Sequence, residues 1–202
     1  MLRIYGSANS RGIRVLWMAG ELGLTYDHKD WLPRSPDTQT PEYRAVNPNA
    51  RVPTIDDDGF ILAESMAINM YLAKKHQSPL YPADPRQEAL VWQWSLWETD
   101  RLDRQIVDYV RHTSALPAAE RKPAVAEAAW KAVAPALDVL ETALAKSGWL
   151  VGSTFTVADL NVASALYRAL TMDLAKYPKL NAWLQRCWGR PAAKKARAMR
   201  EQ

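Results

Sequence analysis

Residues 52–72 read VPTIDDDGFILAESMAINMYL and predict two strands, a tight turn and a helix in immediate succession. The apolar runs VPTID and FILA indicate the strands, and the DDDG between them is typical of a hairpin turn. After Ser65, the apolar residues Ile68, Tyr71 and Leu72 recur at helical spacing and share one face. This stretch therefore predicts a β-hairpin that leads directly into a helix.

The chain before this stretch supplies the rest of one domain. A strand is predicted at Leu2–Tyr5 and another in TYDHKDW at residues 25–31. Between them Ile13, Leu16 and Trp17 predict a helix, and Gly23 is well placed to end it. The resulting order, βαβ, a connection and then ββα, is the thioredoxin-like arrangement, which we assign to residues 1–76.

The chain after this stretch follows a different pattern. QSPLYPADP, with three prolines in nine residues, indicates a linker, which we place at residues 77–84. Residues 85–202 are predicted to form an all-helical domain, so the fold class is an α/β thioredoxin-like domain followed by an all-α domain. Helical stripes support this prediction; they comprise Trp130, Val133, Leu137, Leu140 and Leu144, then Leu180, Trp183, Leu184, Cys187 and Trp188. The basic tail RPAAKKARAMR is predicted to be a solvated helical face.

Composition narrows the classes of function. The 202 residues are 48% hydrophobic and carry a net charge of only +4, which argues against a nucleic-acid-binding protein. The single cysteine excludes an intramolecular disulfide and fits a reducing compartment. Neither a signal peptide nor a membrane-spanning run is recognisable, and the three histidines lack metal-ligand spacing. We therefore expect a cytoplasmic protein without a metal.

The first strand leads into its helix through small polar residues, in YGSANSRGIR at residues 5–14. A thioredoxin-like domain that exchanges dithiols would carry Cys-x-x-Cys there, whereas this chain has Ser10, Arg11, Gly12 and Ile13. Because no protein thiol is present, dithiol exchange is excluded. A hydroxyl at a helix N-terminus instead suits an anion, such as a thiolate that belongs to a ligand.

Two further groups of residues predict contacts with the same ligand. Pro53 stands where a strand should begin, and a cis Val52–Pro53 bond would turn the backbone of Val52 outward; the alternative is an ordinary trans proline at a strand start. Ser65 is a natural helix cap, and Glu64 precedes it. Together they would hold a carboxylate and an ammonium, as in an amino-acid head group. Taken alone, however, this stretch favours the simpler interpretation of a capped helix beside a surface glutamate.

A helix start is also recognisable in FTVADL at residues 155–160. Thr156 and Asp159 have the spacing of a capping box, with Phe155 and Leu160 at the flanking staple positions. This pattern predicts a capped helix N-terminus and gives no indication of function.

Three segments together resemble a known family. YGSANSRGIRVLWMAGELGLTYD, NPNARVPTIDDDGFILAESMAINMYL and WLVGSTFTVADLNVASAL are similar to the bacterial, serine-type cytosolic glutathione S-transferases, related to the theta and phi classes. The resemblance implies a homodimer with a glutathione-binding thioredoxin-like domain. It also implies that Ser10 contacts the glutathione sulfur, that Val52 and cis-Pro53 clasp the cysteinyl backbone, and that Glu64 and Ser65 hold the γ-glutamyl end. Arg51 would lie near the glycyl carboxylate.

The resemblance implies that glutathione is the co-substrate of an enzyme that conjugates it to small electrophiles, with possible peroxidase activity. Tyr5 is an alternative contact for the thiol, since other classes use a tyrosine near the end of the first strand, and Asn9 stays open as a second contact. Arg14 lies one helical turn after Ser10 and would add positive charge near the thiol. A salt bridge or an interface contact explains Arg14 at least as well. The alternative function is a binding or scaffold protein that kept the fold without turnover.

Overall fold

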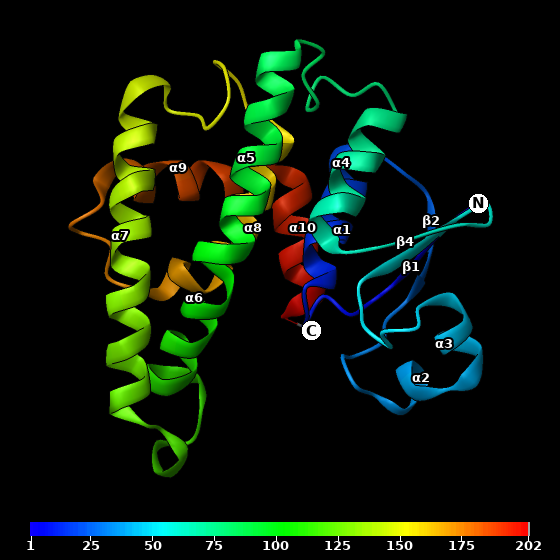
Figure 1. The fold of residues 1–202 in the computed structure, drawn as a ribbon, viewed down its shortest axis with the longest axis horizontal. Helices are drawn as coiled ribbons and strands as arrows, with labels where there is room; N and C mark the ends of the chain where they lie inside the picture. The colour runs from blue at the N-terminus through cyan, green and yellow to red at the C-terminus, as the bar shows by residue number, and fades with distance from the viewer. Residues whose placement is uncertain (202) are drawn as a thin grey trace. The chain divides into compact units, whose positions relative to one another are not determined.

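The computed structural model describes residues 1–201 as two compact units (Figure 1). The first contains Met1–Tyr81 together with the segment that begins at Gly189, and the second is Pro82–Trp188. The predicted division placed all of residues 85–202 in the helical domain. The structure differs in the last segment, because this segment packs on the first unit.

The first unit is built on one four-stranded sheet with the order β2-β1-β3-β4. β1 runs parallel to β2 and antiparallel to β3, and β3 and β4 form an antiparallel hairpin in which Asp57 is opposite Phe60. All four strands occur where the sequence predicts them: β1 (Leu2–Tyr5), β2 (Tyr26–Lys29), β3 (Thr54–Asp57) and β4 (Phe60–Ala63). The thioredoxin-like prediction is therefore confirmed for this unit.

Helices α1 (Gly12–Glu21) and α4 (Ser65–Lys75) pack against each other and contact the sheet (Figure 1). Gly23 has a φ of +63° just after α1, as its predicted role in ending the helix requires. The connection between β2 and β3 forms two short helices, α2 (Pro36–Gln39) and α3 (Pro41–Val46). Each begins with a proline, which suits the first turn of a helix because no N–H is needed there.

The C-terminal helix α10 (Pro191–Arg200) lies beside α1 (Figure 1). One face of this helix is exposed, as predicted, but Ala193 and Ala196 on another face are buried. A bidentate ion pair holds the junction: Arg190 donates from Nε and Nη2 to the two carboxylate oxygens of Glu21, each at 2.7 Å. A small-residue face and one ion pair thus dock the tail, while Lys194 and Arg197 remain exposed.

The second unit consists of helices, as predicted. They are α5 (Pro85–Arg101), α6 (Asp103–Val110), η1 (Arg111–Ala115), η2 (Ala118–Glu120), α7 (Pro123–Ser147), α8 (Val157–Ala165), η3 (Leu166–Thr171) and α9 (Pro178–Trp188). The predicted stripe on α9 is entirely buried, and the stripe on α7 is buried from Val133 to Leu144. Both helices therefore turn their predicted apolar faces to the core of this unit.

The predicted capping box forms at the start of α8. Asp159 is fully buried, and its Oδ2 accepts hydrogen bonds from the N–H of Thr156 at 2.9 Å and from the Thr156 hydroxyl at 3.1 Å. Its Oδ1 accepts from the N–H of Leu150 at 3.0 Å and from the indole N–H of Trp183 at 2.9 Å. Burial raises the pKa of Asp159, and the four hydrogen bonds oppose that rise. One carboxyl group thus ties three segments of the unit together.

A second buried carboxyl group joins the sheet to α4 and gives a test of pH dependence. Asp57 accepts hydrogen bonds from Lys75 at 2.5 Å and from the Tyr71 hydroxyl at 2.7 Å. Burial alone would raise the pKa of Asp57, but the hydrogen bonds from Lys75 and Tyr71 outweigh it, and the pKa lies below its ordinary value. The folded state therefore favours the carboxylate. This contribution to stability is present above the unfolded pKa of about 3.9 and is lost as the pH falls through the folded value.

We expect Asp57→Asn to lower the free energy of unfolding by about 1 kcal/mol at pH 7, because the charged hydrogen bonds are lost. The difference from the wild type should shrink as the pH is lowered below about 4, where Asp57 itself becomes protonated. Urea denaturation at a series of pH values measures both effects. A deficit that is constant with pH would contradict this role for the carboxylate.

Candidate functional site

The turn between β1 and α1 places Ser10 at the start of a helix. The carbonyl of Ser7 accepts hydrogen bonds from the N–H of Ser10 at 3.0 Å and from the Ser10 hydroxyl at 2.7 Å. The Oγ of Ser10 in turn accepts from the N–H of Gly12 at 3.0 Å. This hydrogen bond makes the hydroxyl a cap for the first turn of the helix. Ser10 is also partly exposed, so a ligand can reach it.

Two glycines permit close backbone approaches at this turn. Gly6 has a φ of +139°, and a side chain there would meet the Cα of Pro53 and the Cβ of Val52, both at 3.3 Å. A Cβ on Gly12 would lie only 2.5 Å from the carbonyl oxygen of Ser7. Gly6 therefore permits the close approach of the turn to the segment before β3, and Gly12 permits the tight turn itself.

The Val52–Pro53 peptide bond is cis, as predicted. Within residues 1–201, neither the N–H nor the C=O of Val52 forms a hydrogen bond. The preceding carbonyl, that of Arg51, accepts hydrogen bonds from the Tyr43 hydroxyl at 2.6 Å and from the side-chain amide of Asn47 at 3.0 Å. This loop is thus anchored through the carbonyl of Arg51, while Val52 offers its N–H as a donor and its C=O as an acceptor.

Glu64 and Ser65 form the start of α4. Glu64 is exposed and adopts φ 70° and ψ 111°, a conformation that residues other than glycine rarely take. Ser65 is buried, and the guanidinium of Arg14 donates to its Oγ at 3.3 Å. Backbone strain of this kind, about 1–3 kcal/mol, often accompanies a functional site.

The structure brings the predicted residues together from three parts of the first unit. Gly6 connects the Ser10 turn with Val52 and Pro53, and Arg14 connects α1 with Ser65. The N-termini of α1 and α4 contribute the positive ends of two helix dipoles. Arg14 is almost fully buried and adds a positive charge between them. This arrangement suits a ligand with more than one anionic group.

The C-terminal helix contributes a contact that sequence analysis did not predict. The guanidinium of Arg200, in the last turn of α10, donates to the carbonyl oxygen of Ala8 at 2.8 Å. Ala8 lies two residues before Ser10, so the end of the chain supports the turn that carries the hydroxyl. The signal in the sequence was the alanine spacing of the tail, which marks a packed face among the charges.

Comparison with known proteins identifies the family. The profile described as "Glutathione S-transferase, N-terminal domain" matches residues 10–75, and the profile described as "Glutathione S-transferase, C-terminal domain" matches residues 123–186. Glutathione S-transferase GstB of Escherichia coli strain K12 is 30% identical over 201 residues, which cover 96% of this chain and 97% of that protein. The chain belongs to the glutathione S-transferase family.

Other members of the family are similar over most of their length. The crystal structure of a theta class glutathione S-transferase from Xanthomonas axonopodis pv. citri, with glutathione bound, has a TM-score of 0.89 and 34% identity and covers 96% of both chains. Glutathione S-transferase D7 of Anopheles gambiae is 32% identical over 177 residues, which cover 86% of this chain and 79% of that protein. The resemblance seen in the sequence is thus confirmed.

Within the glutathione S-transferase fold, Tyr5 and Asn9 differ in environment from Ser10. Tyr5 is buried between Trp31 and Tyr43, with ring centroids 5.3 Å from each. Tyr5 is therefore part of an aromatic cluster. The side chain of Asn9 is exposed, and its backbone N–H donates to the Oγ of Ser7 at 3.1 Å.

Two kinds of feature are absent from residues 1–201. These residues hold no group of three or more histidine, cysteine or acidic side chains with the geometry of a metal site. They also include no helix whose length and hydrophobicity would let it cross a membrane.

Proposed function

We propose that this glutathione S-transferase conjugates glutathione to small electrophilic compounds and that Ser10 stabilises the glutathione thiolate. The observation that carries the proposal is the convergence of the Ser10 turn, cis-Pro53 and the start of α4 within one unit. The similar theta class enzyme binds glutathione in its crystal structure, and this supports the tripeptide as the ligand.

Each part of the tripeptide has a proposed partner. The free N–H and C=O of Val52 pair with the cysteinyl backbone as a short antiparallel ladder. Ser65 and the N-terminus of α4 bind the γ-glutamyl carboxylate, and the exposed carboxylate of Glu64 pairs with the ammonium group. Arg51 binds the glycyl carboxylate, for which its planar guanidinium is suited.

The chemistry depends on the loss of the proton from the thiol of glutathione. A free thiol with a pKa of about 8.5 is only slightly ionised at pH 7, and lowering this pKa by two units requires about 2.7 kcal/mol. The hydroxyl of Ser10 donates to the thiolate, and the N-terminus of α1 adds a favourable dipole. To donate, the hydroxyl must rotate away from the carbonyl of Ser7, which it contacts at 2.7 Å. The thiolate then attacks an electrophilic carbon, forming an S–C bond as the leaving group departs.

A titration of the glutathione complex tests this function. We expect the absorbance of the thiolate to appear with an apparent pKa about two units below that of free glutathione, and a panel of electrophiles to include substrates. Hydroperoxides in the same panel test peroxidase activity. Absence of thiolate ionisation near neutral pH, together with failure to bind glutathione, would contradict the proposed enzyme and favour the scaffold function.

We propose that the protein is a homodimer. On the first unit, Phe60 and Ile61 of β4 are 49% and 37% exposed. On the second unit, Trp92 and Leu96 lie one turn apart on α5 and are 46% and 64% exposed. Large apolar side chains in such groups favour burial against a partner, and a second copy of this chain is the partner expected in this family.

The most exposed of these residues gives the test of the dimer. We expect Leu96→Glu to weaken dimerisation about 10- to 100-fold, because the burial of one leucine is lost and a charge is placed at the interface. Light scattering over a concentration series measures the change. Val139→Glu is the matched control, since Val139 is an exposed apolar residue on another helix, α7. A wild-type chain that is monomeric throughout would contradict the proposal.

We also propose that the protein functions in the cytoplasm. The support is chemical: its single cysteine, Cys187, is buried on α9, so the fold uses no disulfide and is suited to a reducing compartment. Fractionation of cells that express the protein from its own gene tests this location.

A further inference from the structure

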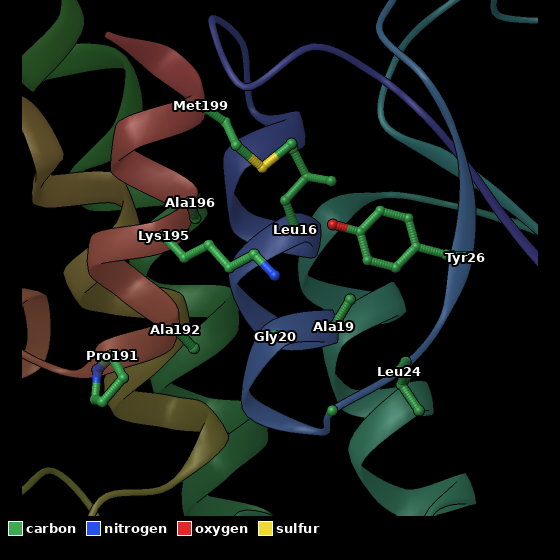
Figure 2. A pocket seen from close by; sticks show the side chains of 11 residues that line it. Leu16, Ala19, Gly20, Leu24, Tyr26, Pro191, Ala192, Lys195, Ala196 and Met199 are labelled. Atoms are coloured by element: carbon green, nitrogen blue, oxygen red, sulfur yellow. The ribbon is translucent and has the colours of Figure 1, made fainter. Parts of the chain in front are cut away.

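A cavity of about 330 Å³ lies in the first unit, between α1, α10 and the segment that leads into β2 (Figure 2). It is lined by the second half of α1 and by the residues that follow this helix, whereas Ser10 lies before its first turn. The cavity is therefore separate from the residues assigned to glutathione. Its volume falls at the lower end of the range of small-molecule sites, which is about 300–1,000 Å³.

The walls of the cavity are apolar. Leu16 contributes from α1, Leu24 from the segment before β2, and Ala196 and Met199 from α10. Figure 2 shows Leu16 and Met199 together at one end of the cavity and Leu24 on the side of β2. Such walls favour a ligand with an aliphatic or aromatic body, because transfer of apolar surface from water stabilises the complex.

Two polar groups reach into this apolar space. Figure 2 shows the side chain of Lys195 extending from α10 across α1, and the hydroxyl of Tyr26 pointing back from β2 toward it. Within residues 1–201, Lys195 forms no ion pair or hydrogen bond, and the Tyr26 hydroxyl has no hydrogen-bond partner. Burial raises the pKa of Tyr26, so its hydroxyl keeps its proton and can donate.

We propose that this cavity binds a small carboxylate with an aliphatic or aromatic body, whose carboxylate group lies between Lys195 and Tyr26. An ammonium and a hydroxyl supply the donors that a carboxylate accepts, and the positive charge of Lys195 is complementary to it. The apolar end of the ligand packs against Leu16 and Met199. Neither polar group takes part in the proposed binding of glutathione.

Calorimetric titration of the full chain with octanoate tests the proposal. We expect saturable binding of one octanoate per chain, and binding of 1-octanol at least fivefold weaker, because the alcohol has the same tail without the charge. No saturable binding of octanoate would overturn the proposal. Equal affinity for the alcohol would overturn the assigned recognition of a carboxylate.

Three variants locate the bound octanoate. Lys195→Gln is expected to raise its dissociation constant about fivefold, and Tyr26→Phe about threefold. Lys194→Gln is the matched control: it removes the same charge from the neighbouring position of α10, which does not line the cavity, and should leave the dissociation constant unchanged. Equal affinities of the Lys195 and Lys194 variants would place the ligand elsewhere and overturn the proposal. Because Lys195 is exposed, we expect the Lys195→Gln and Lys194→Gln variants to have the same midpoint of thermal unfolding.

Discussion

Ser10→Ala is expected to lower kcat/KM for glutathione conjugation about 100-fold, the effect typical of removing one hydrogen bond to a reacting anion. The reason is that the hydroxyl donates to the thiolate, and without it the pKa of the bound thiol should rise toward its ordinary value of about 8.5. Steady-state kinetics and the thiolate absorbance of the glutathione complex measure the two effects separately. Tyr5→Phe should change neither by more than about twofold, because Tyr5 packs between Trp31 and Tyr43.

The same hydroxyl also caps α1, so two further variants separate binding from helix stability. Ser10→Thr keeps a hydroxyl and should retain much of the activity. Ser10→Asp keeps an acceptor for the N–H of Gly12 and should preserve the cap. Its charge would repel the thiolate, so a stable and inactive protein is expected. An active Ser10→Asp variant, or a Tyr5→Phe variant that loses more activity than Ser10→Ala, would refute the role of Ser10.

Asp159→Ala is expected to reduce the free energy of unfolding by about 3–5 kcal/mol, the largest effect on stability that we predict. The substitution leaves the N–H groups of Leu150 and Thr156 and the indole N–H of Trp183 buried without their acceptor. Urea denaturation followed by far-UV circular dichroism, which reports on the helical unit, measures the loss.

Smaller substitutions at the same place give a graded comparison. Thr156→Ala removes one hydroxyl and should cost about 1 kcal/mol. Trp183→Phe removes one of the four donors and much of a buried ring, so a loss of about 2 kcal/mol is expected. If Asp159→Ala were no more destabilising than Thr156→Ala, the carboxyl group would not be the shared acceptor that joins the three segments.

Most secondary structure could be predicted because local patterns decide it. The short runs VPTID and FILA, with the DDDG turn between them, predict β3 and β4, and Thr156 with Asp159 predicts the start of α8. Helices α2 and α3 were not predicted, since each has at most six residues and carries little periodicity. The tail was interpreted from its charge alone, and its alanine face was therefore overlooked.

In the candidate site, too, the features that depend on local sequence were predicted, and the contacts between distant residues were not. Ser10, cis-Pro53 and the pair Glu64 and Ser65 were found in the sequence because each is unusual in its local context. The contact of Arg14 with Ser65 and that of Arg200 with Ala8 join residues 51 and 192 positions apart. No local pattern indicates such a pair, because its formation depends on how whole elements pack.

By itself, the sequence determined the order of the four strands and of helices α1 and α4, the absence of a dithiol motif, and a hydroxyl at the first helix. These properties depend on neighbours within a few residues and on backbone preferences that act locally. The tertiary structure alone decided that the last helix belongs to the first unit, that Arg14 lies buried beside Ser65, and that Lys195 and Tyr26 face one cavity. Those outcomes arise from the burial of small-residue and apolar faces between distant segments, whose free energy depends on the complete packed fold.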